Sequence, residues 1–261
     1  MTQPVSPVPI ERHQQILNEA LTRRVLRVKD LAQVLGVHEM TVRRDLDLLA
    51  DQGLLERVHG GARLTQRTSE ELSQHLRAMQ QQESKSRMAR AALALINDGE
   101  AVAFDSSTTT LALVDLMPAR EAQAIVTSLD AAARLASVGL PFTLLGGTFN
   151  AQSRSFVGPL STSALRRLHP DKVFFSAKSF SPDFGFSDPR LPEAETKEVL
   201  IANASLVVAM VDHTKFGRRS LHTIVDLSAV DVLITDDLPG PEVLAALEAN
   251  DTRLIVAQEA P

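Results

Sequence analysis

The chain has 261 residues, of which 44% are hydrophobic and 23% are charged, a balance typical of globular proteins with one large domain or two smaller ones. It contains no cysteine, which excludes disulfides, thiolate nucleophiles and cysteine-bound metals, and it has no apolar run near the ~18 residues that span a bilayer. The net charge of −5 conceals a split, because residues 1–65 hold nine Lys and Arg against eight Asp and Glu, while residues 66–261 hold eighteen against twenty-four.

The first segment, MTQPVSPVPI, has no basic stretch followed by an apolar one. We therefore expect no signal peptide, a cytoplasmic protein and a disordered lead-in over residues 1–8. A helix is predicted over Ile10–Leu21, followed by a short extended link around residues 25–28 and a second helix over Lys29–Leu35. Gly36 comes next, at a position where a tight turn requires a positive φ.

The following helix carries the sequence TVRRDL at residues 41–46, in which two arginines precede an aspartate. A period of 3.6 residues gives this helix an apolar and a polar face, with Arg44 on the polar face and Arg43 at its flank. Two short helices joined by a glycine turn form a helix-turn-helix, whose second helix lies in the major groove of DNA. The alternative is a plain three-helix bundle with a solvated charge cluster. We expect Asp45 to orient an arginine or to cap a neighbouring amide.

A β-hairpin is predicted directly after this helix, in GLLERVHGGARL (53–64), with its turn at Gly60 and Gly61. A hairpin in this position makes the module over residues 9–65 a winged helix-turn-helix, which weakens the three-helix-bundle interpretation. Arginines of such a module can pair with the edge of a guanine or grip a phosphate. The predicted contacts with double-stranded DNA are His38, Thr41, Arg43, Arg44, Arg57, His59 and Arg63.

The stretch VHEMTVRRDLDLLADQGLLERVHGGA, residues 37–62, resembles the DNA-binding signature of the DeoR family of bacterial transcriptional regulators. That family carries a TIRRDL-like core and an HGGA-like wing at this spacing. The resemblance implies a transcriptional repressor that binds operator DNA.

Residues 66–84 are polar, rich in glutamine and free of Gly and Pro, which predicts a helical linker, with a flexible tether as the alternative. Beyond them, helices alternate with short strands rich in Val, Ile and Leu, which predicts for residues 85–261 a Rossmann-like α/β domain with a mainly parallel sheet. Its predicted elements cover Lys85–Ile96, Ala101–Phe104, Thr109–Met117, Ala124–Val126, Ala131–Ala136, Phe142–Leu145, Val173–Ser176, Thr196–Asn203, Leu206–Met210, Val232–Thr235, Pro241–Ala249 and Leu254–Ala257.

Hydroxyl groups are concentrated where the predicted strands end, which is where ligands of such sheets bind. In FDSSTTTLAL (104–113), Asp105 and a run of Ser and Thr lie between a strand and a helix, and IVTSLD (125–130) repeats the arrangement. Hydroxyls and free amides there suit a phosphate or a sugar oxygen, and ordinary helix caps are the alternative.

Four further segments extend this edge. LLGGTFN (144–150) has two glycines that let the backbone approach a ligand or merely turn the chain. FGFSD (184–188) and EAETK (193–197) supply carboxylates and a lysine, and VDHTKFG (211–217) places an aspartate and a lysine in one turn.

In this order the segments resemble the effector-sensing domain of the DeoR family, whose fold is related to that of ribose-5-phosphate isomerase and whose members commonly sense phosphorylated sugars or their relatives. Two residues depart from the family pattern, since Ser107 replaces the usual glycine and Ser128 replaces the usual asparagine. The resemblance implies effector contacts at Asp105, Thr108, Thr109, Thr127, Ser128, Gly146, Gly147, Lys197, Asp212 and Lys215. Ser106 and Ser107 join them, and Gln152, Arg154 and Lys178 are candidates for replacement contacts.

Three functions are compatible with these patterns. The first is a repressor of a carbohydrate-catabolism operon, a homodimer or tetramer released by a sugar phosphate or a related polyhydroxylated effector. The second is a sugar-phosphate isomerase or transferase that uses Asp105, Asp212 and Lys215 as acid and base groups, although an isomerase has no use for a winged helix. The third is a constitutive DNA-binding protein whose body only oligomerises. The seven histidines lack metal-ligand spacing, so neither a metal nor a cofactor is expected.

Overall fold

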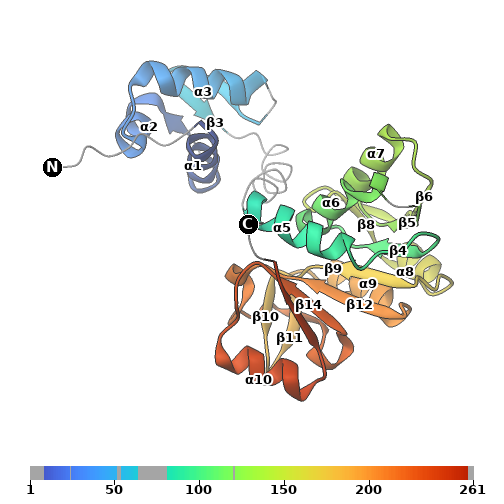
Figure 1. Ribbon diagram of the computed structural model, residues 1–261. Helices are drawn as coiled ribbons and strands as arrows, with labels where there is room; N and C mark the ends of the chain where they lie inside the picture. Colours follow the sequence, from blue (N-terminus) through green and yellow to red (C-terminus); the bar gives the residue numbers. More distant parts are fainter. Residues whose placement is uncertain (1–8, 24, 52–53, 64–80, 120, 258–261) are drawn as a thin grey trace. The chain divides into compact units, whose positions relative to one another are not determined.

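The computed structural model describes residues 9–23, 25–51, 54–63, 81–119 and 121–257, and it divides into two compact units, Met1–Gln80 and Gln81–Pro261 (Figure 1). The predicted lead-in lies outside the described residues, as does the predicted linker except for its last four positions. Those four form a turn and the start of helix α5 (Gln82–Leu93), so this helix begins earlier than the sequence pattern predicts.

The N-terminal unit combines three helices with a small antiparallel sheet. Ile16, Leu31 and Leu46 lie in its buried core, because each belongs to the apolar face of a different helix. Gly36 joins the second and third helices in the left-handed conformation, at a φ of 63°. This is the predicted helix-turn-helix with a wing. Its elements are α1 (Pro9–Thr22), β1 (Leu26–Arg27), α2 (Val28–Leu35), α3 (Glu39–Asp51), β2 (Glu56–Val58) and β3 (Gly61–Arg63), with strand order β1-β3-β2.

The wing hairpin differs from the prediction in the position of its turn. Residues 59 and 60 form the turn, with Gly60 at a φ of 77°, whereas Gly61 is the first residue of β3. A Cβ atom on Gly61 would lie 1.8 Å from the carbonyl oxygen of Leu26 on β1. Gly60 therefore serves the turn, while Gly61 lets β1 and β3 approach each other.

A seven-stranded sheet forms the centre of the C-terminal unit (Figure 1), and every adjacent pair of its strands is parallel. This confirms the predicted Rossmann-like sheet. In spatial order the strands are β15 (Arg253–Val256), β14 (Val232–Thr235), β12 (Leu206–Met210), β9 (Lys172–Phe175), β4 (Ala101–Phe104), β5 (Gln123–Val126) and β6 (Phe142–Leu144).

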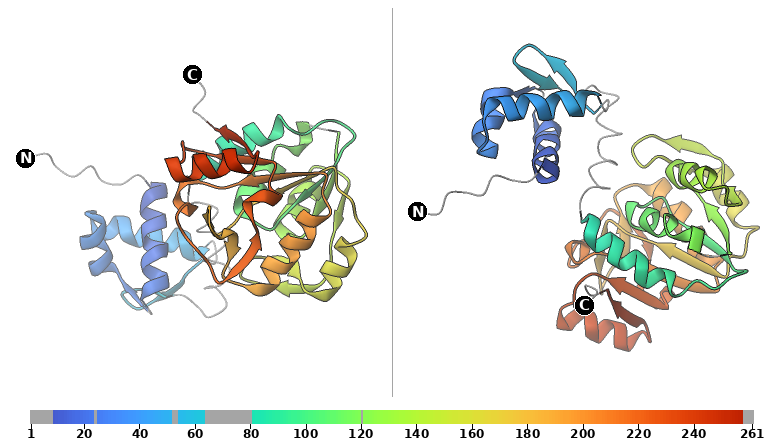
Figure 2. Two further views of the ribbon diagram at one scale, coloured as in Figure 1. Left: turned by 90° about the horizontal axis from the view of Figure 1, so that it is seen from below. Right: turned by 45° about the horizontal axis from the view of Figure 1, so that its top comes forward.

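Helices cover both faces of this sheet, as can be followed in Figure 2. One face packs against α5, α6 (Thr108–Val114) and α7 (Leu129–Ser137), and the other packs against α8 (Pro159–Leu165), α9 (Leu191–Ala202) and α10 (Pro241–Ala249). Successive side chains of a strand point to opposite faces. In β4, Val102 and Phe104 therefore belong to the first apolar core and Ala103 to the second.

Several short elements were not predicted from the sequence. They are the hairpin of β7 (Thr148–Asn150) and β8 (Ser155–Val157), the antiparallel sheet of β10 (Ser179–Ser181), β11 (Gly185–Asp188) and β13 (His222–Val225), helix α8, and the 3-10 turns η1 (Met117–Ala119), η2 (His213–Lys215) and η3 (Leu227–Ala229).

Helix α9 also starts five residues before the predicted one. The segment EAETK, interpreted as a loop, therefore lies within a helix. None of the described helices is long and apolar enough to cross a membrane.

Candidate functional site

The exposed side of α3 is the candidate contact surface of the N-terminal unit. Arg43 and Arg44 both project into solvent there, as predicted from the period of the helix. Arg43 lies 3.6 Å from the carboxylate of Glu39 one turn earlier. Arg44 has no ion pair with any residue that the structure describes. Two guanidinium groups are thus presented side by side on the helix after the glycine turn.

Asp45, between these arginines and the core, fixes which face of α3 is buried. It is 6% exposed, and it accepts hydrogen bonds from Nε and Nη2 of Arg12 at 2.6 and 2.9 Å, with Nε2 of His13 at 3.0 Å. Burial alone would raise the pKa of Asp45, but Arg12 and His13 hold it below its usual value. The arginine that Asp45 orients therefore belongs to α1, and the pair binds α1 to α3.

The two wing arginines selected from the sequence are engaged within the unit itself. Nε of Arg57 lies 2.8 Å from the Asp47 carboxylate on α3, and its Nη1 donates to the carbonyl of Gly61 at 2.6 Å. Arg63 pairs with Glu56 across the hairpin at 3.0 and 3.1 Å, and both side chains are exposed. These contacts hold the wing hairpin and join it to α3, which is a structural task that the sequence did not reveal.

The remaining predicted contacts of this unit have different surroundings. His38 is exposed and its Nδ1 accepts the amide of Met40 at 3.2 Å, so it caps the start of α3. Thr41 is half-buried on the first turn of that helix, and His59 is exposed in the wing turn.

In the C-terminal unit, Asp105 follows β4 and is only 2% exposed. Its Oδ1 accepts from the hydroxyl of Thr110 at 2.7 Å and from the amide of Ser107 at 3.0 Å. Its Oδ2 accepts from the amide of Ser176 at 3.1 Å and lies 3.0 Å from the ammonium group of Lys197. Burial alone would raise the pKa of Asp105, but Lys197 and the hydrogen bonds hold it below its usual value. Both oxygens are therefore occupied by donors of the chain itself.

Lys197, on the buried face of α9, balances this carboxylate. Its Nζ donates to the carbonyl of Ser176 at 2.6 Å and lies 3.9 Å from the carboxylate of Asp188. Burial would lower the pKa of Lys197, but Asp105, Asp188 and Glu193 together raise it above its usual value. The ammonium group is therefore charged at neutral pH, and its partners are buried groups of the chain itself.

Glu193 lies one turn before Lys197 on α9 and is 3% exposed. It accepts hydrogen bonds from two segments, and these bonds and Lys197 hold its pKa below the usual value although burial acts to raise it. Its carboxylate thereby links the loop after β4 to the β7–β8 hairpin. The donors are the hydroxyls of Ser106 at 3.1 Å, of Ser155 at 2.7 Å and of Ser153, and the side-chain amide of Asn150 at 3.0 Å.

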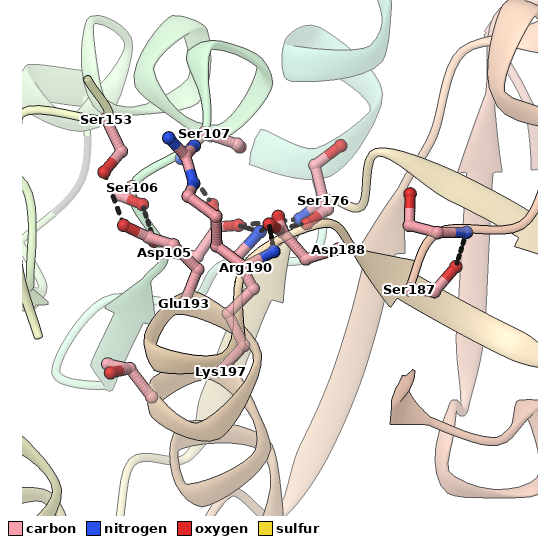
Figure 3. A network of polar contacts seen from close by, with 12 residues as sticks. Asp105, Ser106, Ser107, Ser153, Ser176, Ser187, Asp188, Arg190, Glu193 and Lys197 are labelled. Carbon is pink, nitrogen blue, oxygen red and sulfur yellow. Dashed lines mark hydrogen bonds and ion pairs between the residues drawn. The ribbon is translucent and has the colours of Figure 1, made fainter. Parts of the chain in front are cut away.

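Figure 3 shows this buried network at the carboxyl ends of β4 and β9. The chain leaves β4 towards β5 on one side and leaves β9 towards β12 on the other, so the direction of winding reverses between these two neighbouring strands. The crevice at such a reversal is where open α/β sheets bind ligands. Asp105 and Ser176 lie at this point.

The hydroxyl residues of the first loop differ from the prediction in what they contact. Ser107 caps α6, since its Oγ accepts the Thr110 amide at 3.1 Å, and Ser106 bonds to Glu193. Thr109 is buried and Thr108 is half-buried. Capping and the internal network, which the sequence left open as the alternative to ligand binding, account for these serine hydroxyls.

The second and third loops are also occupied by internal contacts. Ser128 caps α7 through the amide of Ala131 at 3.3 Å, and the buried Thr127 accepts the amide of Phe156 on its carbonyl at 2.8 Å. Arg154 pairs with Asp130 at 2.7 Å.

Of the two glycines in LLGGTFN, a Cβ on Gly147 would lie 2.7 Å from the carbonyl oxygen of Val157, so this glycine is required for close packing of the chain. Gly146 meets no atom within 4 Å of such a position. Only Gly146 therefore leaves space beside its backbone.

Asp212 and Lys215 lie at the end of β12 and are not bonded to the Asp105 network. Asp212 caps η2 through the amide of Thr214 at 3.0 Å, and Nζ of Lys215 lies 3.9 Å from it. Lys178 is half-buried between β9 and β10. Among the residues that the structure describes, the predicted effector contacts thus include a buried network and a more exposed lysine-bearing turn, and their sharing of one pocket stays a prediction.

Comparison with known proteins identifies both units. A profile of the DeoR C terminal sensor domain matches residues 80–237, and a profile of the DeoR-like helix-turn-helix domain matches residues 12–68. The chain belongs to the DeoR family. The sensor match ends at residue 237, although α10 and β15 beyond it complete the second core and the edge of the sheet in this DeoR-family protein.

Individual relatives cover almost the whole chain. The HTH-type transcriptional regulator YulB of Bacillus subtilis is 32% identical over 245 residues, 94% of this chain and 95% of YulB. The HTH-type transcriptional repressor GlcR of the same organism is 30% identical over 250 residues, 95% of this chain and 96% of GlcR. These relatives are regulators, which confirms the prediction of a regulator over that of an enzyme. Ribose 5-phosphate isomerase A from Methanocaldococcus jannaschii aligns over 52% of this chain and 55% of its own, with 15% identity and a TM-score of 0.39.

Some members of the sensor network were not selected from the sequence. One of them is Glu193, although its i, i+4 spacing from the predicted contact Lys197 in EAETK is a signal that the two share a helix face if the segment is helical. Ser153 and Ser155 are two positions apart, and this spacing does not indicate that both bond to Glu193. Arg190, at the start of α9, lies in no motif at all.

A surface cavity of about 810 Å³ lies at the opposite edge of the DeoR-family sheet. It is lined by Gly99, just before β4, and by Gln123, the first residue of β5, so it lies at the amino ends of strands whose carboxyl ends carry Asp105 and Thr127. It shares no residue with the predicted effector site. Within the described residues, no group of three or more His, Asp or Glu is arranged to hold a metal ion.

Proposed function

We propose that this DeoR-family regulator is a repressor of a carbohydrate-catabolism operon that leaves its operator when a sugar phosphate or a related polyhydroxylated compound binds its sensor unit. The observation that carries the proposal is the burial of Asp45, which fixes α3 so that Arg43 and Arg44 face solvent. A helix so placed after a glycine turn fits the major groove, where an arginine fork matches the two acceptors of guanine.

The sensor unit supports the effector part of the proposal through its crevice at the strand reversal. Asp105 and Lys197 bond chiefly to each other and to backbone, so we assign them to holding the crevice in shape rather than to holding the ligand. Ligand contacts then fall to the groups around them that retain exposure, such as Thr108, Lys178 and Lys215.

The hydrogen bonds and the ion pair that occupy both oxygens of Asp105 also count against a catalytic role for this residue. A general base must reach the proton that it removes with a free lone pair, and chain donors approach both oxygens of Asp105.

A homodimer or tetramer is the assembly that we propose for binding. One winged helix offers a small contact surface, and two half-sites read by two copies multiply affinity. Light scattering at micromolar concentration, with and without operator DNA, checks this, and a monomeric mass in both samples would reject it. Operator binding places the protein in the cytoplasm.

The first turn of α5 offers a route by which the sensor influences the residues that precede it. Ser84 there helps to lower the pKa of Asp236, which follows β14, and Asp236 accepts the amide of His213 at 2.7 Å, with the ring Nδ1 at 2.9 Å. His213 lies between Asp212 and Lys215 in η2. A ligand that moves η2 would therefore act on α5, the helix that begins the sensor unit after the predicted linker.

Two linked assays test the proposal. An operator is first selected from random duplexes with the full chain, and sugars and sugar phosphates are then screened for a rise in the Tm of the protein. A compound that binds should also lower operator affinity, with a coupling of about 1–3 kcal/mol, or 5- to 150-fold. If no duplex is enriched, the DNA-binding proposal is wrong; if compounds bind without changing operator affinity, the repressor is constitutive.

A further inference from the structure

Arg190 is a charged group beside the buried network, and the partner of its side chain among the described residues is a neutral amide. It is the N-cap of α9, and its backbone amide donates to the Asp188 carboxylate at 3.1 Å. Its half-buried side chain donates through Nη1 to the side-chain oxygen of Gln152. No carboxylate among the described residues lies within ion-pair distance of its guanidinium group.

One donor of this guanidinium group is buried without an acceptor. Nε of Arg190 is shielded from solvent and has no hydrogen-bond partner among the described residues. Folded proteins leave few buried donors unpaired, and each such donor calls for an explanation. An acceptor atom on a bound ligand would explain the unpaired Nε of Arg190.

The position of the group indicates where that acceptor would lie. In Figure 3 the Arg190 side chain extends towards the side of the network on which Ser106, Ser107 and Ser153 are labelled. This is the end of the sheet at which the winding reverses between β4 and β9. The unpaired donor is therefore at the site where a ligand of this fold binds.

The charges around the crevice restrict what the acceptor can be. Asp105, Asp188 and Glu193 are three buried carboxylates, and the buried Lys197 lies 3.0 Å from Asp105 and 3.9 Å from Asp188. An anion placed against the carboxylates would be repelled, and Lys197 is already committed. An anionic group on a ligand is therefore disfavoured beside the carboxylates and stabilised on the side of Arg190.

We propose that Arg190 recognises the phosphate group of the effector, exchanging the oxygen of Gln152 for phosphate oxygens. The planar fork of an arginine binds phosphate through two parallel hydrogen bonds, and Nε with one Nη forms such a fork. Arg190 thereby decides between phosphorylated and neutral sugars. The inference rests on the proposed effector function of this unit and assigns one residue to its specificity.

The test measures phosphate binding directly, with inorganic phosphate as the probe in calorimetry and in thermal shift at constant ionic strength. Arg190→Gln should weaken binding by about ten- to a hundredfold, the loss expected for hydrogen bonds to a charged group. Arg166→Gln is the matched control, since Arg166 is exposed at the end of α8. Gln152→Ala removes the competing acceptor and should leave phosphate binding equal or tighter, which a purely structural Arg190 would not do.

Folding of the variants is checked by circular dichroism, and Arg190→Lys, which keeps the charge without the fork, should bind with intermediate affinity. Equal phosphate binding by the wild type, Arg190→Gln and Arg166→Gln, or no phosphate binding by the wild type, overturns the proposal. Response of operator binding to a neutral sugar alone would leave the proposed repressor function standing while removing the role of Arg190. Absence of any response to sugars or sugar phosphates would remove both.

Discussion

Replacement of Lys197 by methionine isolates the ion pair on which the sensor crevice is built. Methionine keeps most of the volume and length of the side chain, so packing changes little. Asp105 is then left 2% exposed with the donors of Thr110, Ser107 and Ser176 but without its cation. Removal of one partner of a buried pair costs about 3–5 kcal/mol, a large part of the ~5–15 kcal/mol that stabilises a typical domain.

The loss should also depend on pH. In the wild type the pKa of Asp105 lies below its usual value, so its contribution to stability is complete above about 3.9, the pKa of an unfolded Asp, and is lost as pH falls through the folded pKa. In Lys197→Met the effect of burial dominates and raises the pKa of Asp105, so the variant gains stability as the carboxyl is protonated. The difference between the two proteins should therefore shrink from pH 7 to about pH 4.

Hydrogen exchange of the β4 and β9 amides, followed by mass spectrometry, measures the stability of the sensor unit without interference from the DNA-binding unit. Lys215→Met is the control, because that lysine is partly exposed at 3.9 Å from Asp212 and its loss should cost less than about 1 kcal/mol. A cost for Lys197→Met below about 1 kcal/mol at pH 7, or a cost that does not change with pH, would refute the account.

Three further outcomes follow from other contacts. Asp45→Ala leaves Arg12 without its buried acceptor and should destabilise the N-terminal unit by about 3 kcal/mol, so unchanged hydrogen exchange in α1 and α3 would contradict it. Arg44→Ala should cost about 1–3 kcal/mol of operator binding in fluorescence anisotropy at fixed salt, and an unchanged Kd would exclude a base contact. Burial acts to raise the pKa of Glu100, but bonds from Lys172 and Asn97 lower it to about 2. The contribution of Glu100 to stability is therefore complete above about pH 4.5 and is lost towards pH 2. Glu100→Gln should be less stable than the wild type at pH 5, and this difference should disappear towards pH 2. Acid-unfolding curves that stay parallel for the two proteins would contradict this pH dependence.

The elements with a clear period were predictable from the sequence. Four segments, Ala101–Phe104, Leu206–Met210, Val232–Thr235 and Pro241–Ala249, have the predicted bounds, because continuous apolar strands and a proline-started helix leave a strong local pattern. The helix-turn-helix was equally predictable, because its two signals, Gly36 and the apolar face of α3, lie within a short stretch of the sequence.

What the sequence could not show are contacts between segments far apart in the chain. Nothing local indicates that Ser153 and Ser155 bond to Glu193, about forty residues later, or that Asp45 bonds to Arg12. The hydroxyl run after β4 predicts a ligand site, and the bond from Ser106 to Glu193, 87 residues later, is fixed only by the fold. Short antiparallel strands such as β10 and β11 are similarly too brief to give a period.

A sugar-type effector, bound in the C-terminal unit, is proposed to control operator binding by α3. The most direct measurement is the Kd of the full chain for its selected operator, by fluorescence anisotropy, across a titration of the compound that most raises the Tm of the protein. The account predicts a Kd that rises with the compound by about 5- to 150-fold and then saturates at the concentration that saturates the thermal shift. A Kd that stays constant while the thermal shift saturates would contradict it.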